Sequence, residues 1–288
     1  MDGIVLINKE KNCTSRDVVN QVSKILKTKK IGHTGTLDPI ATGVLVLCIG
    51  KATKLVEVIT SYDKEYEAEV ILGIKTDTKD ITGKILKEEK AIISKENIEK
   101  CLKQMIGTYN QTVPIYSAVK INGKKLYEYA RNNEEIELPK RKVTIKELKL
   151  ISDITYEKEK TKFKIKCHVS KGTYIRSLIE DIATNLNTIG TMENLKRTKQ
   201  GNFQIANANT IQDIENNKFK IYPIEEILEK FYKIEMTDDL YFKIKNGSII
   251  KNNYNHDIVA FTKNNKIIAI YKEYSKDKTL LKPWKMFL

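Results

Sequence analysis

The sequence predicts an α+β domain built around a largely antiparallel sheet, followed by a small all-β module. Two observations support this prediction. Segments with strand patterns arrive in adjacent groups with helices scattered among them, and the pattern changes near Pro223. A parallel α/β fold would instead alternate strands and helices regularly. We therefore expect one domain over residues 1–222 and a second over residues 223–288.

The chain begins with a short buried strand at residues 4–8, followed by a helix that Thr14 and Ser15 open. Threonine and serine are favoured at helix N-caps. Apolar side chains recur on one face of this helix at Val18, Val19, Val22, Ile25 and Leu26. A lysine cluster ends it, where positive charge complements the helix dipole.

The later elements follow from the same signals. Alternation of apolar and charged side chains predicts strands, helical spacing with a terminal glycine predicts a helix, and Asn-Gly predicts a tight turn. In chain order we expect a strand at 44–49, a short helix at 52–60, a strand at 64–72, a helix at 94–106, a turn at Asn122-Gly123, strands at 138–151 and 162–169, a helix that residues 171–176 open, and short strands at 258–261 and 266–271.

Composition limits the classes of function. The chain has 51 basic and 37 acidic side chains, a net charge of +14, which indicates a polyanionic partner such as nucleic acid. A general enrichment in lysine is the alternative explanation. The four cysteines form no CxxC pair, which disfavours a zinc site or a disulfide framework. With no long apolar run and no leader pattern, we expect a cytoplasmic protein without a membrane span.

The most informative motif is the glycine-rich segment from Gly32 to Gly43, which contains Asp38 and then enters an apolar strand. Glycines allow close approach of a ligand to the backbone, and Pro39 keeps Asp38 out of helical geometry. Such a loop can hold a carboxylate rigidly as a nucleophile or base. The alternative is an Asp-Pro turn in which the carboxylate only caps the backbone.

Other residues could join Asp38. His33 lies in the same loop and suits acid–base chemistry or a phosphate contact. Arg176 lies near a predicted helix start and could keep a carboxylate ionised. Tyr66 and Tyr174 lie among apolar residues, where core packing is the default and stacking on a flat base is the functional alternative. The glycine spacing fits neither common phosphate-binding motif, and an HxGH nucleotidyltransferase signature fails at Thr36.

Taken together, these motifs resemble the TruB family of bacterial tRNA pseudouridine synthases, which act on the T-loop uridine at position 55 of tRNA. The matching segments run in register through about two hundred residues: 32–45, Gly50-Lys51-Ala52-Thr53-Lys54, Lys64-Glu65-Tyr66, 116–120, 123–131, 170–178 and Leu195-Lys196-Arg197. The C-terminal segment is similar to the small RNA-binding β-barrel called PUA, which often ends this family.

The resemblance implies a pseudouridine-synthase-like catalytic domain and specific roles. Asp38 would be the catalytic nucleophile, Tyr66 would stack on the target base, and Arg176 would pair with Asp38. His33, Tyr174 and Leu195 would line the uridine pocket, while Lys9 and Lys54 would support the pocket or its phosphates. The family needs no cofactor or metal, and its partner is the T-arm of tRNA.

One segment departs from the family, which usually reads Asn/Asp-Lys-Pro-x-Gly where this chain has Asn8-Lys9-Glu10-Lys11-Asn12. We expect a monomer with no obligate protein partner, because no coiled-coil heptad is present. The segment at 107–135 could be an insertion that clamps RNA. The alternative from another class is a non-catalytic protein that binds or folds tRNA with the same basic surface.

Overall fold

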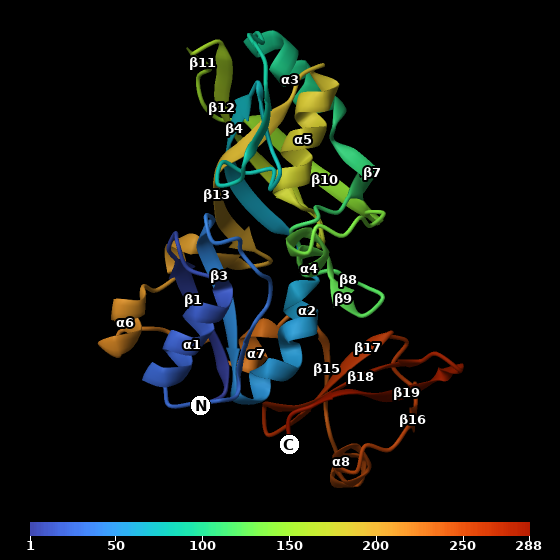
Figure 1. Ribbon diagram of the computed structural model, residues 1–288. Coiled ribbons are helices and arrows are strands. Elements are labelled where there is room, and N and C mark those ends of the chain that lie inside the picture. The colour runs from blue at the N-terminus through green and yellow to red at the C-terminus, as the bar shows by residue number, and fades with distance from the viewer.

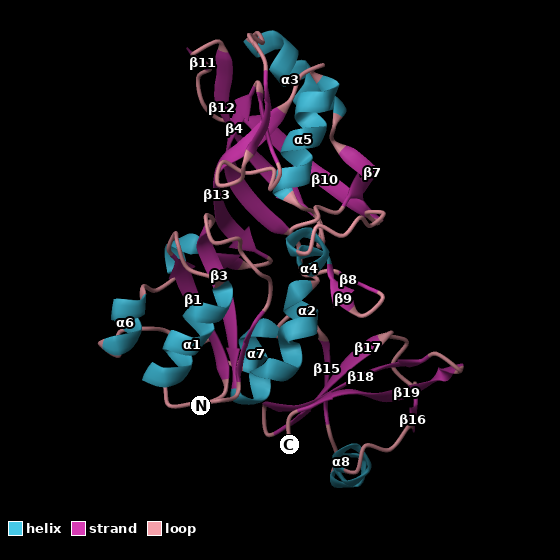
Figure 2. Cartoon of the chain, viewed as in Figure 1, coloured by secondary structure: helices cyan, strands magenta, loops and turns pink.

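The computed structural model describes residues 1–288 and consists of a long mixed sheet with helices on its faces and a smaller sheet at the C-terminus (Figures 1 and 2). The spatial order of the main path is β1 (Gly3–Lys9), β3 (Thr42–Ile49), β13 (Gly190–Gln200), β4 (Lys64–Leu72), β12 (Lys160–Val169), β10 (Lys140–Leu150) and β7 (Gly107–Thr112). Only β13 and β3 pair in parallel within this sheet. The predicted α+β class with a largely antiparallel sheet is confirmed.

Short strands and hairpins extend this frame. The strands β2 (Ile31–His33), β14 (Phe203–Gln204) and β11 (Thr155–Glu157) pair with β3, β13 and β12 respectively. Two separate hairpins are formed by β5 (Ile74–Thr76) with β6 (Ile85–Glu88), and by β8 (Lys120–Ile121) with β9 (Lys124–Lys125). The predicted Asn122-Gly123 turn joins β8 to β9, and both turn residues have positive φ.

Helices cover the sheet in two regions (Figure 1). At one end, α3 (Lys95–Gln104) and α5 (Ile175–Asn185) pack with β4, β10 and β12 around one apolar core. At the other end, α1 (Ser15–Ile25) and α6 (Ile211–Glu215) pack against β1 and β3. The predicted cap of α1 is confirmed, because Thr14 and Asp17 form a reciprocal capping box. Asp17 supplies the acidic partner that a capping box requires.

The C-terminal region forms a five-stranded sheet in the order β15 (Tyr232–Glu235), β17 (Ile258–Lys263), β18 (Lys266–Tyr274), β19 (Asp277–Met286) and β16 (Ile250–Lys251). The strands β15 and β16 at its two ends do not pair with each other, so the sheet is open and not a closed barrel. The expectation of an all-β module is wrong in one respect, since α7 (Ile224–Ile227) and α8 (Asp238–Lys245) belong to this region. The domain boundary at residue 222 stays a prediction.

A shared apolar core joins the C-terminal sheet to the main domain. Ile267, Ile270 and Phe287 pack in one cluster with Ile4 and Leu55. Leu55 is the last residue of η1 (Gly50–Leu55), a 3-10 helix that continues directly into α2 (Val56–Thr60). The single helix expected at 52–60 is therefore two consecutive helices of different type. This core fixes the C-terminal sheet to the main domain through buried apolar contacts.

Several expectations from composition can be compared with the structure. The cysteines are all free, and Cys48, Cys101 and Cys167 are buried, where cysteine packs as a small apolar side chain. No helix is long and apolar enough to cross a membrane. In the segment that departs from the family pattern, Asn12 has φ +63 and donates its N–H to the Pro39 carbonyl at 2.9 Å. Asparagine tolerates this left-handed conformation, so the turn forms without the usual glycine.

Candidate active site

Asp38 lies in the loop between β2 and β3, and this loop is held from below by buried polar groups. Ser15 Oγ accepts the Leu37 N–H at 2.9 Å. The buried ammonium of Lys9 donates to the Ala41 carbonyl at 2.7 Å and also bonds the Glu10 and Pro39 carbonyls. These bonds satisfy backbone groups that a buried loop would otherwise leave unpaired. The predicted rigid presentation of Asp38 therefore has a structural basis.

Gly43 explains why the motif needs glycine where the loop enters β3. Its φ is +106, and a Cβ there would lie 2.2 Å from the Arg197 carbonyl oxygen. That contact is with backbone, so no rotamer change relieves it. The close approach lets β3 pair with β13 directly beside the Asp38 loop.

Arg176 holds the Asp38 carboxylate through two bonds. Its Nε lies 2.9 Å from Oδ2 and its Nη2 lies 3.1 Å from Oδ1. The guanidinium is 5% exposed and also donates to the Thr78 and Tyr116 carbonyls. This two-point geometry is specific to arginine, because lysine offers a single point charge. The structure thus brings together the acid and the arginine that the sequence singled out 138 residues apart.

Two opposing effects act on the pKa of Asp38. Enclosure by the cavity walls raises the pKa, because the charged form loses solvent, and the nearby Asp80 raises it further. The Arg176 guanidinium opposes this rise. The side chain is still 32% exposed, so the carboxylate faces the cavity rather than the protein core. It is available to a ligand.

The cavity above Asp38 has a volume of about 860 Å³. Positive charge predominates in its lining, where Asp38 is the single carboxylate. Six cationic side chains line the cavity: Lys64, Arg141, Lys142, Lys171, Arg176 and Arg197. Aromatic side chains also line it, namely Tyr66, Tyr116, Tyr127 and Tyr174. Cationic and aromatic surfaces together are suited to phosphates and unstacked bases.

Three of the expected pocket residues line this cavity. Tyr66 on β4 is 8% exposed, and burial raises the pKa of its phenol. Leu195 on β13 is 5% exposed. Tyr174 precedes α5 and exchanges backbone hydrogen bonds with the Gln111 side chain, which fixes its position. The structure therefore places Tyr66, Tyr174 and Leu195 around Asp38.

Three other expected residues do not line the cavity. His33 is half-buried at the end of β2, where burial lowers its pKa, helped by Arg16 and Arg197. Lys9 lies beneath the loop with its ammonium bonded to backbone carbonyls. The ammonium of Lys54 donates to the Met286 carbonyl, which anchors the C-terminal strand. Lys54 was expected to support the pocket or its phosphates; its ammonium instead joins η1 (Gly50–Leu55) to the C-terminal strand.

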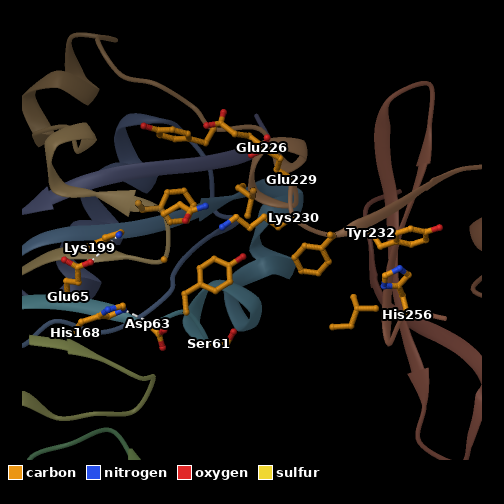
Figure 3. A pocket seen from close by; sticks show the side chains of 18 residues that line it. Ser61, Asp63, Glu65, His168, Lys199, Glu226, Glu229, Lys230, Tyr232 and His256 are labelled. Atoms are coloured by element: carbon orange, nitrogen blue, oxygen red, sulfur yellow. Dashed lines mark ion pairs between the residues drawn. The ribbon is translucent and has the colours of Figure 1, made fainter. Parts of the chain in front are cut away.

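A second hollow of about 960 Å³ lies between the main sheet and the C-terminal module (Figure 3). It contains four carboxylates, two lysines and two histidines: Asp63, Glu65, Glu226, Glu229, Lys199, Lys230, His168 and His256. Glu65 pairs with Lys199, and Asp63 lies 3.8 Å from His168. Its acidic excess disfavours a polyanion, and none of its carboxylates is held by an arginine. We therefore assign the candidate site to the Asp38 cavity.

Sequence reasoning missed Asp80, a second carboxylate beside Arg176. Its carboxylate is buried, lies 4.0 Å from Arg176 Nη1, and accepts bonds from Thr78 and Thr82. The available signal was the run Thr78-Lys79-Asp80-Ile81-Thr82, in which threonines flank an acid. Such a run also fits an ordinary polar turn, so the sequence alone gave no reason to connect it with Arg176.

Comparison with known proteins places the chain in a family. Residues 23–175 match the model described as TruB family pseudouridylate synthase (N terminal domain), and residues 176–232 match the tRNA pseudouridylate synthase B C-terminal domain. The chain is 41% identical to tRNA pseudouridine synthase B of Bacillus cytotoxicus over 100% of this chain and 98% of that protein. It is 39% identical to the protein of the same name from Bacillus licheniformis, with the same coverage.

Solved structures agree at the level of the fold. The chain is similar to a chain in a Cbf5–Nop10–Gar1 complex, with TM-score 0.72 and 24% identity over 99% of this chain and 85% of that one. A chain of the archaeal box H/ACA Nop10–Cbf5 complex gives TM-score 0.71 and 20% identity, covering 99% and 86%. With the sequence matches, these findings identify the chain as a member of the TruB family of pseudouridine synthases, isomerases that convert uridine in tRNA to pseudouridine.

Proposed function

We propose that this chain modifies the T-loop uridine at position 55 of tRNA and that Asp38 is the catalytic nucleophile. The observation that carries the assignment of the site is the two-point bond between Arg176 and Asp38 at the wall of a cavity lined by six cations and one acid. The names of the bacterial relatives support tRNA as the substrate, and the motif resemblance to the TruB family supports the restriction to the T-loop.

The reaction requires little chemistry beyond a positioned acid. The bond between ribose C1′ and uracil N1 breaks, the base turns, and a bond forms between C1′ and C5. A proton leaves C5 and another is taken up at N1, so there is no net redox change. Asp38 takes part in these steps as an ionised carboxylate, whether it attacks the sugar or base or takes a sugar proton. Arg176 favours that ionised form against the effect of burial.

The target base must leave its stack to reach Asp38. Extrusion of a base costs a few kcal/mol, and stacking on an aromatic side chain returns about 1–3 kcal/mol. We assign the stacking role to Tyr66, with Tyr174 and Leu195 as further walls of the uridine pocket. Lys9 and His33 act indirectly, through the loop that presents Asp38.

We further propose that the T-arm is bound by a single copy of this chain without an obligate protein partner. The insertion around α4 (Leu126–Arg131) supports T-arm binding, because Tyr127 faces the cavity and two cations, Lys125 and Arg131, lie over its ring. Contacts from lysine and arginine to phosphates make such binding strongly salt-dependent.

The position of modification is testable on unmodified tRNA transcripts. After incubation with the protein, carbodiimide labelling and primer extension should report one new stop, at the T-loop uridine. A transcript with cytidine at that position is the matched control and should show no stop. Modification of a different uridine, with position 55 untouched, would overturn the T-loop assignment while leaving the family assignment intact.

A further inference from the structure

Lys64 is a buried lysine in the wall of the Asp38 cavity. It is 7% exposed and begins β4, two residues before Tyr66. Because strand side chains alternate, Lys64 and Tyr66 lie on the same face of the sheet. Its ammonium donates to the Thr60 carbonyl at 2.6 Å and to the Tyr62 carbonyl at 2.7 Å. These two bonds fix the position of the charge.

Comparison with Lys9 shows what is unusual about the hydrogen bonding of Lys64. An ammonium has three donors, and that of Lys9 bonds three backbone carbonyls. Lys64 bonds two, and its side chain borders the cavity, whereas Lys9 does not. Lys64 therefore keeps one donor for a ligand, in a position already set by the other two bonds.

Lys64 also has no carboxylate within ion-pair distance, although 18 such pairs occur elsewhere in the chain. Its charged neighbours are mostly cationic, with Arg197 on β13 and Lys171 before α5 opposing its charge and Asp63 favouring it. Buried charges are normally paired, because an unpaired one loses solvation without compensation. An anion bound in the cavity would supply the missing partner.

We propose that Lys64 binds a nonbridging oxygen of a phosphodiester that flanks the target uridine, an inference that rests on the proposed function. The bond is charge-assisted, and the adjacent Arg197 adds positive potential to the same wall. This contact positions the sugar of the flipped nucleotide relative to Asp38. Lys64 is therefore a substrate-binding residue and takes no part in bond breaking.

Protonation of Lys64 supplies an independent readout. Burial, together with Arg197 and Lys171, lowers the pKa of Lys64 to about 8, and Asp63 only partly opposes this. In the free protein the charge is present below that pH and is lost as the pH rises through it. A bound phosphate raises the pKa again. RNA affinity that depends on this contact should therefore weaken above pH 8.

The test combines a substitution at Lys64 with removal of the charge of one phosphate in the RNA. In a T-arm stem-loop, the phosphates that flank the target uridine are replaced one at a time by an uncharged methylphosphonate. Kd is measured at fixed salt for the wild type, Lys64→Met and Lys164→Met. Lys164 is the control because it pairs with Glu69 on an exposed part of the sheet. Binding by Asp38→Asn in the same assay separates this test from any failure of turnover.

We expect one of the two methylphosphonates to weaken wild-type and Lys164→Met binding by roughly 10-fold or more. The same replacement should leave Lys64→Met unaffected, because the contact is already lost. Equal penalties for all three proteins would overturn the proposal. Should Lys64→Met fail to fold, the wild-type penalty measured at neutral pH and well above pH 8 decides instead. The penalty should shrink at high pH, and a constant penalty contradicts the role of Lys64.

Discussion

Replacing Arg176 by lysine tests how the site keeps its acid ionised. The substitution preserves the positive charge but removes the fork that bonds both oxygens of Asp38 at 2.9 and 3.1 Å. A hydrogen bond to a charged group contributes about 1.5–3 kcal/mol, and one pKa unit corresponds to about 1.4 kcal/mol. Loss of one of the two bonds should therefore destabilise the ionised form of Asp38 by about 1.5–3 kcal/mol, and this raises its pKa further.

The direction of the effect on rate follows from this shift. Asp38 must be ionised to act, and a higher pKa leaves less of the carboxylate ionised at a given acidic pH. The acid limb of the profile of kcat/KM against pH should therefore move to higher pH. At the plateau, turnover should fall as well, because the carboxylate is no longer oriented from two points.

The assay is release of tritium from C5 of the target uridine across a pH series. Arg16→Lys is the matched control, since Arg16 is an exposed residue of α1 that does not border the cavity. A native thermal melt must accompany each profile, because Arg176→Lys also disturbs bonds to the Thr78 and Tyr116 carbonyls. An acid limb that stays in its wild-type place in a folded Arg176→Lys protein would refute this account of the pair.

Three further outcomes are expected. Asp80→Asn should move the acid limb to lower pH, opposite to Arg176→Lys, because the negative charge of Asp80 raises the Asp38 pKa; a shift to higher pH would contradict this. Tyr66→Ala should lose most turnover while still unfolding in one cooperative thermal transition, with a lower midpoint because the side chain is only 8% exposed; wild-type turnover would exclude the stacking role. Gly43→Ala should lower the free energy of unfolding in urea by at least about 2 kcal/mol, because its Cβ meets backbone at 2.2 Å; an unchanged midpoint would refute the steric argument.

The strand β4 shows what periodicity alone predicts well. Its bounds, Lys64–Leu72, agree with the prediction, because apolar and charged side chains alternate from Glu65 to Val70. The central strand β13 was not predicted at all. Its register shifts twice against β4, between Met192 and Asn194 and between Arg197 and Lys199. Each β-bulge reverses the alternation, so a strand in the middle of the sheet lacks the pattern that would reveal it.

The residues of the site likewise differ in how far the sequence alone could predict them. Asp38 was found from local signals, a glycine-rich loop and a following proline, and Arg176 from a helix start. Their contact depends on tertiary structure, and so does the buried Asp80 beside them. Lys54 was expected at the site because it lies in a segment that matches the family. In the structure it contacts Met286 in the C-terminal strand and does not border the cavity. Spacing in the sequence carries no information on which of these side chains face one cavity.

The most direct measurement is tritium release from tRNA carrying 5-tritiated uridine, comparing the wild type with Asp38→Asn in the absence of added metal or nucleotide. Filter binding of the same tRNA runs beside it. We expect release by the wild type, no release by Asp38→Asn, and tRNA binding by both. Release by Asp38→Asn at the wild-type rate would contradict the assignment of Asp38, and tight binding without release by either protein would favour a non-catalytic RNA-binding role.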